Sequence, residues 1–441
     1  MKQTLVLLFS LFYFVCASAQ AQIKPKLLAG PVIGAVTKTT AKIWIGYVGK
    51  GDNALVLGDT SENKLIYPTS MNYISNKKGE VALTMEFTGL KPGRTYNILV
   101  SIDGYGTHAK FSFKTEDENP TKDFDFLVGS CNLLQYDVTR AVFPGGANWI
   151  YKRMKKKDGE FMVWLGDNVY YLYRKDWSTY EGMFKRQMKT RRAFNKFYRN
   201  FLGNQPNYAM WDDHDYGPNN ADKNFALKDT SLKIFKAFWP NEYPLRGSLN
   251  GNYFSFKKYD AEFFMTDCRF HRDTKGDTAG SFLGETQILW LKNKLTTSDA
   301  TFKFICIGSQ VLNDNGFDES YSDFPRERND LLDFIADNNI KGVIFLTGDK
   351  HYSELCKRNW KGYPMYDFTC SPLTAPPLPR KLLGAYKNQW RVAGTDYARR
   401  NFGGIAISGN KGERMISLKI YGRAGGKRRE ITLSQKDFQK Q

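Results

Sequence analysis

Thiol, carboxylate, phenol and imidazole side chains follow four short hydrophobic runs of this 441-residue chain. These six candidate metal ligands are Cys131, Asp167, Tyr170, Asp213, Asp349 and His351. Turns that contain Gly-Ser or Gly-Asp are common in loops, so any one of the four stretches is weak evidence. Taken together, they predict one metal site.

The donor types indicate which cations such a site could hold. Asp167 and Tyr170 stand three residues apart, so a turn that folds back can bring both oxygens to one ion. A tyrosinate together with a thiolate favours a hard, highly charged ion such as ferric iron over magnesium alone. Asp213 and Asn219 would add oxygen donors of the kind that calcium accepts. The set contains few histidines, so it favours iron with calcium over zinc.

Several of these residues also have an ordinary structural explanation. In an extended segment Asp349 and His351 point to the same side, but an Asp-x-His in a loop is more often a solvated turn than a ligand pair. Tyr170 could be a packed aromatic side chain, and Cys131 a small buried hydrophobic one. Residues 212–215 are harder to explain in this way, because their three carboxylates repel one another unless a cation or basic groups compensate.

Each of the four stretches follows a segment that is expected to be a short buried strand. These segments are residues 124–128, 161–165, 208–211 and 342–346. Strands that are buried on both faces imply a parallel sheet. In open α/β sheets, binding sites form beyond the carboxyl ends of the strands. The candidate ligands are therefore expected to converge at one edge of a sheet.

The chain beyond residue 123 alternates between strands and helices. Helical spacing is predicted over residues 137–157, 180–202, 285–295 and 326–338. Further strands are predicted over residues 253–256, 262–266, 302–307, 415–421 and 430–433. This alternation indicates an α/β domain in which a second sheet accompanies the first.

Residues 28–115 show a different pattern, in which apolar and polar residues alternate with a period of two. Turns at Pro92-Gly93 and Asp103-Gly104 separate the expected antiparallel strands, as in small β-sandwiches of the immunoglobulin or fibronectin type III kind. We place this sandwich at residues 20–115, a polar linker at 116–123 and the α/β domain at 124–441.

The first 19 residues are predicted to be a secretory signal. Lys2 precedes an apolar run over residues 5–15, and Ala17-Ser18-Ala19 supplies small residues for cleavage. The run is too short to span a bilayer. A membrane anchor, or a lipid attached to Cys16, is the less favoured alternative. The mature chain would then be exported to a periplasm, the cell surface or the medium.

The chain is strongly basic, with a formal net charge of +19. Removing the signal removes one lysine, which leaves 63 minus 45, or +18. Such a surface would attract phosphate-bearing polymers or anionic lipids, although a generally cationic surface without a specific partner is an equal alternative. The basic residues are spread out in short clusters, so no stable nucleic-acid partner is predicted.

Five cysteines remain after the signal, and an odd number leaves at least one thiol unpaired. Cys306 lies inside an apolar run and is expected to be buried. A bridge between Cys356 and Cys370 stays open at this stage.

Several motifs resemble those of one enzyme family, the PhoD-like alkaline phosphatases of the calcineurin-like metallophosphoesterase superfamily. The matching segments are residues 89–96, 129–131, 165–170, 211–217, 267–269, 284–287 and 347–351. The resemblance implies an N-terminal fibronectin-like domain, followed by two packed β-sheets flanked by helices, with metals at the strand tips.

The resemblance also implies roles for individual residues. Ferric iron would be held by Cys131, Asp167, Tyr170 and His351. Calcium, or another divalent metal, would be held by Asp167, Asp349, Asp213 and Asn219. A metal-activated oxygen would attack phosphorus. His214 would protonate the leaving group or bind a phosphoryl oxygen, and Arg140 and Lys350 would contact phosphate.

The expected function is that of an exported phosphoesterase, which hydrolyses phosphate diesters, monoesters or both. The first alternative is a secreted phospholipase or nuclease that acts on polyanionic substrates. The second is a surface-binding protein with a vestigial site.

Overall fold

The computed structural model describes residues 26–49, 55–59, 62, 64–102, 105–134, 149–157, 159–192, 196–243, 250–277, 279–314, 319–379, 382 and 388–440. The predicted secretory signal and Arg140 lie outside the described residues. Within these described ranges, no helix combines the length and hydropathy needed to cross a membrane.

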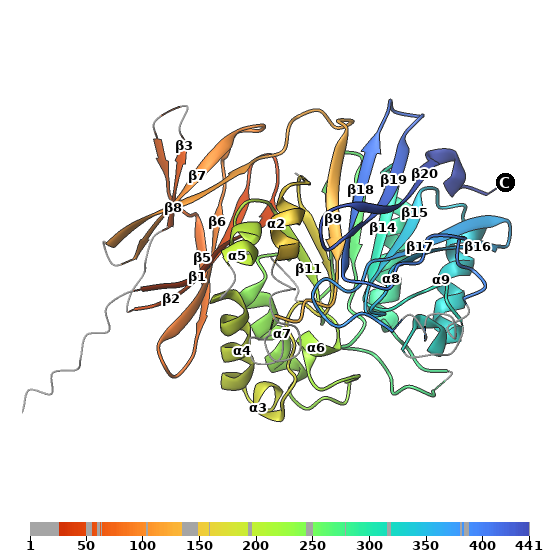
Figure 1. Cartoon of the computed structure of the whole chain (residues 1–441), viewed down its shortest axis with the longest axis horizontal. Coiled ribbons are helices and arrows are strands. Elements are labelled where there is room, and N and C mark those ends of the chain that lie inside the picture. Colours follow the sequence, from red (N-terminus) through yellow and green to blue (C-terminus); the bar gives the residue numbers. More distant parts are fainter. Residues whose placement is uncertain are drawn as a thin grey trace, which may run out of the picture.

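Eight antiparallel strands form two four-stranded sheets at one end of the molecule (Figure 1). The first sheet has the order β1 (Lys26–Val36), β2 (Ala41–Val48), β6 (Glu80–Phe87) and β5 (Ser70–Ser75). The second has the order β4 (Lys64–Ile66), β3 (Leu55–Asp59), β7 (Thr95–Ile102) and β8 (Tyr105–Lys114). Their alternating apolar residues pack face to face, for example Ile43, Met85, Ile98 and Phe113. The sandwich expected from the period of two is therefore present, while its outer boundaries stay predictions.

Two six-stranded sheets form the larger part of the chain. The first has the order β11 (Asn207–Met210), β10 (Met162–Leu165), β9 (Phe124–Gly129), β18 (Asn401–Ser408), β19 (Met415–Gly422) and β20 (Lys427–Ser434). The second has the order β12 (Phe254–Lys258), β13 (Ala261–Met265), β14 (Phe302–Ile307), β15 (Val343–Thr347), β17 (Tyr363–Thr369) and β16 (Glu354–Trp360).

The two large sheets pack against each other through an aromatic core. Phe126 stacks on Phe161 with ring centroids 4.9 Å apart, and its edge meets Phe304 of the second sheet at 5.3 Å. Residues on both faces of these strands are buried, as the continuous apolar runs predicted. The predicted α/β class, with a sandwich followed by a two-sheet core, is confirmed.

Helices cover the outer faces of both large sheets (Figure 1). On the first sheet lie α2 (Trp149–Lys155), α4 (Tyr180–Arg192), α5 (Lys196–Leu202) and α7 (Lys228–Phe238). The short helices α3 (Arg174–Trp177) and α6 (Asp213–Tyr216) precede α4 and α7. On the second sheet lie α8 (Glu285–Thr297) and α9 (Pro325–Asp337). The 3-10 helices η1 (Tyr321–Asp323) and η2 (Gln435–Phe438) complete the described elements.

Three details differ from the expectations. The four motif-bearing strands do not share one parallel sheet, because β9, β10 and β11 are parallel in the first sheet while β15 lies in the second. Both sheets are buried on both faces, so hydrophobicity alone could not separate them. The helix expected over residues 180–202 is assigned as α4 and α5, and of the helix expected over 137–157 only α2 is described. Helix α7 was not anticipated.

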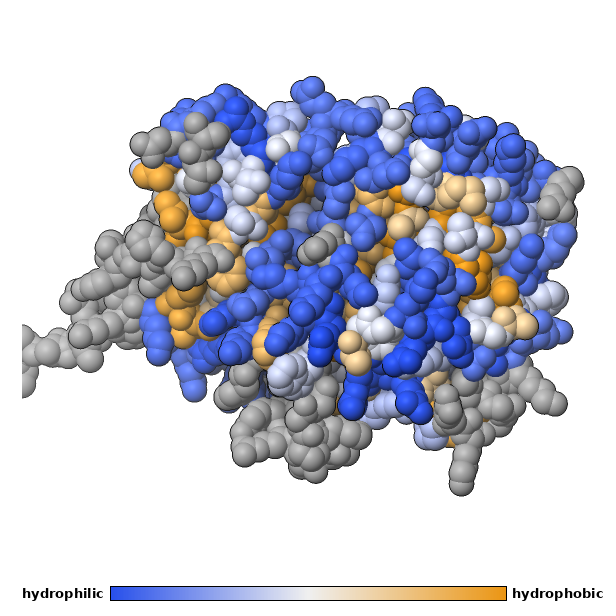
Figure 2. Space-filling view, turned by 45° about the horizontal axis from the view of Figure 1, so that its top comes forward, coloured by the Kyte–Doolittle hydropathy of each residue, from blue (hydrophilic) through white to orange (hydrophobic). Residues whose placement is uncertain are grey.

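The cysteines are reduced throughout the described part of the chain. Cys131, Cys268, Cys306, Cys356 and Cys370 are all buried free thiols. Cys356 and Cys370 are therefore not bridged in this structure. The face shown in Figure 2 is mostly hydrophilic, with hydrophobic residues gathered in a few bands.

The sandwich is attached directly to the strand that leads into the Asp213 loop. In β1, the carbonyl of Ile33 accepts a hydrogen bond from Asn207 Nδ2 at 3.0 Å, and the carbonyl of Val36 accepts one from Tyr208 OH at 3.1 Å. Both donors belong to β11. The orientation of the sandwich is thus coupled to the position of this strand.

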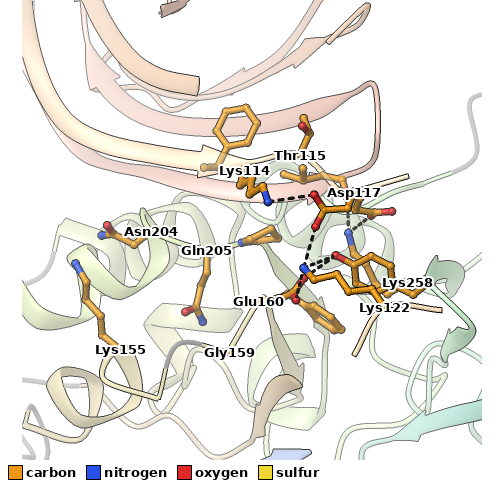
Figure 3. A pocket seen from close by; sticks show the side chains of 16 residues that line it. Lys114, Thr115, Asp117, Lys122, Lys155, Gly159, Glu160, Asn204, Gln205 and Lys258 are labelled. Atoms are coloured by element: carbon orange, nitrogen blue, oxygen red, sulfur yellow. Dashed lines mark hydrogen bonds and ion pairs between the residues drawn. The ribbon is translucent and has the colours of Figure 1, made fainter. Parts of the chain in front are cut away.

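Ion pairs add to this attachment around a cavity of about 430 Å³ between the sandwich and the core (Figure 3). Asp117, at the start of the linker, lies 3.1 Å from Lys114 Nζ and 2.9 Å from Lys122 Nζ. Lys122 Nζ also lies 2.9 Å from Glu160 of the core. The charged side chains of this cavity largely neutralise one another, and the cavity does not contain the candidate ligands.

Candidate metal centre

Four predicted ligands share an unusual backbone conformation. The φ angles of Cys131, Asp167, Asp349 and His351 are 56°, 55°, 66° and 56°. Residues other than glycine rarely adopt this left-handed conformation, and each such residue costs about 1–3 kcal/mol. Strain of this kind clusters at functional sites, where the surrounding structure holds it in place.

These ligands lie in turns at the carboxyl ends of strands from both large sheets. Cys131 follows β9, Asp167 follows β10 and Asp349 follows β15. The backbone N–H of Cys131 donates to the carbonyl of Gly166 at 3.3 Å, and its Sγ donates to the carbonyl of Asp349 at 3.6 Å. The ends of β9 and β15, which belong to different sheets, therefore lie side by side at Cys131 and Asp349, while a shared ligand role for all the candidate residues stays a prediction.

A thiol, a phenol and a carboxylate are grouped on one side of the site. Tyr170 OH donates to Asp167 Oδ2 at 3.0 Å, and Ser371 Oγ donates to Cys131 Sγ at 3.1 Å. Burial, with a smaller contribution from Asp349, raises the pKa of Cys131 to about 12. Burial and the nearby Asp167 also raise the pKa of Tyr170 well above its usual value. Both groups hold their protons unless a cation replaces them.

The second group consists of Asp167, Asp213 and His214, whose ligand atoms lie within 4.8 Å of one another. His214 Nδ1 is buried and has no hydrogen-bond partner, while the ring stacks on Tyr170 with centroids 4.3 Å apart. Burial and the charge of Asp213 raise the pKa of Asp167 well above its usual value. Two crowded carboxylates fit a hard cation, and the unpartnered imidazole nitrogen beside them stays available for other contacts.

The other carboxylates of the aspartate run have partners within the protein. Asp212 Oδ1 accepts from Arg269 Nε at 2.5 Å. Asp215 accepts backbone N–H groups of Asn168 and Val169 at 3.0 and 2.8 Å, although burial still raises its pKa to about 8. A basic group thus compensates Asp212 and backbone N–H groups compensate Asp215, while Asp213 accepts the backbone N–H of Asn220 at 2.8 Å and lies beside Asp167 and His214.

The remaining predicted residues lie in different surroundings. His351 donates its backbone N–H to Ser371 Oγ at 3.0 Å, which places it beside the Cys131 turn. Asn219 is exposed and its Nδ2 donates to Asn220 Oδ1 at 2.9 Å, while the N–H of Asn220 donates to Asp213. Lys350 Nζ donates to the carbonyl of Glu319. The ligand and substrate roles of these residues stay predictions.

Sequence reasoning gave no role to several residues that shape the site. Ser371 follows β17 and donates a hydrogen bond to Cys131 Sγ. Asn168 Nδ2 donates a hydrogen bond to the carbonyl of Met210 at 2.7 Å, which fixes the turn that contains Asp167. No local pattern indicates either contact. Arg269, by contrast, was visible in the segment 267–269 as part of a motif, without an assigned partner.

The fold is similar to that of a known protein. A solved structure described as PhoD superimposes with a TM-score of 0.72 and 17% sequence identity, covering 93% of this chain and 91% of that one. Alkaline phosphatase D of Bacillus subtilis (strain 168) is 24% identical over 320 residues, or 60% of this chain. The match spans 54% of that relative's length.

A family model described as PhoD-like phosphatase matches residues 126–412, a range that includes Cys131, Asp167, Asp213 and Asp349. Of the two large sheets, this range leaves out the start of β9 and the whole of β19 and β20. The chain belongs to the PhoD-like phosphatase family.

Proposed function

We propose that this protein hydrolyses phosphate diesters, phosphate monoesters or both, as a metal-dependent phosphoesterase. The observation that carries the proposal is the meeting of donor-bearing turns from two sheets, with Asp167, Asp213 and His214 within 4.8 Å of one another. Family membership supports the same reaction class. A vestigial site would not be expected to retain four strained ligand positions at this edge.

We further propose ferric iron and calcium as the cations. Cys131, Tyr170, Asp167 and His351 would hold iron, because thiolate and tyrosinate suit a highly charged ion. Asp167, Asp213, Asn219 and Asp349 would hold calcium through oxygen. When bound, the cations supply charge neutralisation at the phosphoryl oxygens and an activated oxygen nucleophile.

The residues of the chain then orient the ester and move one proton. Asp167 lies between the two groups of donors, because it contacts Tyr170 OH on one side and the N–H of His214 on the other. The unpartnered Nδ1 of His214 can give a proton to the leaving oxygen or bind a phosphoryl oxygen. Stacking on Tyr170 limits rotation of the imidazole ring and so holds this nitrogen in one direction.

Export and a preference for polyanionic substrates are proposed from the sequence. The signal pattern of residues 1–19 supports export to a periplasm, the cell surface or the medium. After loss of the signal the net charge is 63 minus 45, or +18, which favours a second candidate function, a secreted phospholipase or nuclease that selects polyanionic substrates.

Hydrolysis assays with purified protein test the proposal. Protein supplied with iron and calcium is expected to cleave an aryl phosphate or a bis-aryl phosphate, and a chelator should abolish this activity reversibly. Asp167→Asn should remove it, whereas Asp330→Asn, at an exposed position on α9, should not. Protein that is loaded with both metals and cleaves neither ester would refute the reaction class.

A further inference from the structure

A buried arginine connects the loop that carries Asp213 with the loop that carries Asp349. The side chain of Arg269 has no exposed surface. Its Nε donates to Asp212 Oδ1 at 2.5 Å, and its Nη2 donates to Glu319 Oε2 at 2.8 Å. Because Asp212 directly precedes Asp213, one end of the guanidinium fixes the first of these loops.

Glu319 continues the connection on the other side. Its backbone carbonyl accepts a hydrogen bond from Lys350 Nζ. The same ammonium lies 3.3 Å from Asp349 Oδ2. Arg272 Nη2 holds the second carboxylate oxygen of Glu319 at 2.6 Å. A continuous chain of charged contacts therefore joins the two loops.

The turn that presents Arg269 is fixed as well. Asp267 Oδ1 accepts the backbone N–H groups of Arg269 and Phe270 at 2.9 and 3.0 Å. The same oxygen accepts Trp211 Nε1 at 2.7 Å. Trp211 directly precedes Asp212, so two independent contacts set the position of the arginine relative to the aspartate loop.

Stability alone gives little reason for this arrangement. Burying a charge costs several kcal/mol even when it is paired, and well-packed hydrophobic residues are often at least as stabilising as a buried ion pair. Here three cations, Arg269, Arg272 and Lys350, face the carboxylates of Asp212, Glu319 and Asp349. Buried charged contacts behind candidate ligands are typical of residues that orient metal ligands from outside.

We infer that Arg269 is a positioning residue for the metal centre. Through Asp212 on one side, and through Glu319 and Lys350 on the other, its guanidinium sets the spacing between Asp213 and Asp349. The inference rests on the proposed function only in taking these two carboxylates as cation ligands. Lysine cannot replace Arg269 in this role, because its one nitrogen cannot reproduce the separate positions of Nε, which bonds Asp212, and Nη2, which bonds Glu319.

Calcium binding to the metal-free protein tests the inference without an activity assay. Arg269→Lys keeps the charge but loses one of the two contacts, so we expect calcium affinity to fall by about 10- to 100-fold. Isothermal titration calorimetry with calcium as the sole ligand measures this change. Asp212→Asn and Glu319→Gln each weaken one end of the connection through Arg269. The loss of calcium-binding free energy in the double variant should therefore be smaller than the sum of the losses in the two single variants.

Arg414→Lys is the matched control. Arg414 also has no exposed side-chain surface and lies 2.9 Å from both Asp123 and Asp260, but at the opposite ends of the strands from the site. This variant should lose thermal stability to a similar degree and keep its calcium affinity.

The outcomes separate this inference from the proposed function. Equal calcium affinity in the wild type, Arg269→Lys and Arg414→Lys would overturn the positioning role, and so would a wild type that binds no calcium. If calcium affinity falls in Arg269→Lys but not in Arg414→Lys, and the metal-loaded wild type cleaves no phosphate ester, the positioning role is supported and the proposed function is refuted.

Discussion

Cys131, Asp167, Asp349 and His351 are held in a backbone conformation that each of them would avoid in a free peptide. Their side chains belong to three different chemical types, so the shared conformation does not come from residue preference. It comes from the turns that follow the strand ends, whose hydrogen bonds hold these residues in place. At the scale of the residue, the site is therefore preorganised before any ion arrives.

Tyr170→Phe tests the proposed iron ligands. Tyrosinate or thiolate bound to ferric iron should give a visible charge-transfer band, so iron-loaded Tyr170→Phe should lose much of this absorbance, and Cys131→Ser should weaken it. The control is Tyr171→Phe, because Tyr171 is equally buried but its OH bonds Gln187 at 3.1 Å. A colourless, iron-free and fully active protein would refute the ligand assignment and leave the reaction class intact.

His214→Ala tests the proton donor. General acid catalysis is worth about 100-fold or more, chiefly when the leaving group is basic. We therefore expect kcat to fall by about that factor for an alkyl ester and much less for a nitrophenyl ester. The control variant His271→Ala should leave kcat unchanged for both esters, since His271 Nε2 is hydrogen-bonded to the carbonyl of Asn250 at 2.6 Å. An equal loss for both esters would argue against proton donation.

At the scale of the elements, β11 has two tasks. Its carboxyl end leads into the Asp213 loop, and its residues Asn207 and Tyr208 bond the sandwich strand β1. Asn241 adds a third restraint, because its side chain bonds both the N–H and the carbonyl of Ala209, at 2.9 and 2.8 Å. The sandwich thus acts as a brace for one of the strands that carry the site.

Lys258→Met tests the strength of this brace. Lys258 is buried, and its ammonium pairs with Glu116 and with the carbonyl of Val36. Removing one partner of a buried pair leaves a charge uncompensated, so the free energy of unfolding should fall by about 3 kcal/mol in urea denaturation. Lys257→Met, at a half-exposed neighbour that pairs with Asp299, should cost less than about 1 kcal/mol. Similar losses for the two variants would contradict the brace.

At the scale of the whole molecule, the candidate site lies at the carboxyl ends of strands from both large sheets, and the surface around it belongs to a strongly basic protein. The net charge of +19 creates a field that reaches beyond the site but is screened by salt. Such a field changes the encounter with long polyanions more than the encounter with small esters.

The salt dependence of turnover tests whether this charge selects a polymer. If it does, kcat/KM on a polyanionic phosphodiester should fall steeply between about 50 and about 200 mM salt, because each neutralised phosphate releases counterions. Turnover of a bis-aryl phosphate should change little over the same range. Parallel responses of the two substrates would leave the charge without a role in substrate choice.

The sequence was sufficient for features that depend on neighbouring residues. Strand β14 was predicted over residues 302–307 as observed, and α8 and α9 were placed within two residues at each end, since hydrophobic period is a local property. The candidate ligands Cys131, Asp167, Asp213 and Asp349 could be found because each follows a buried strand directly. Their motifs also indicated the family.

Only the tertiary structure decided how these pieces are combined. It placed β15 in a different sheet from β9, β10 and β11, because two sheets that are buried on both faces have the same hydrophobic pattern. It also gave Asp212 and Asp215 their compensating partners, the guanidinium of Arg269 and the backbone N–H of Asn168, which are distant in the sequence. Such partners depend on long-range packing, and residue type and spacing carry no record of it.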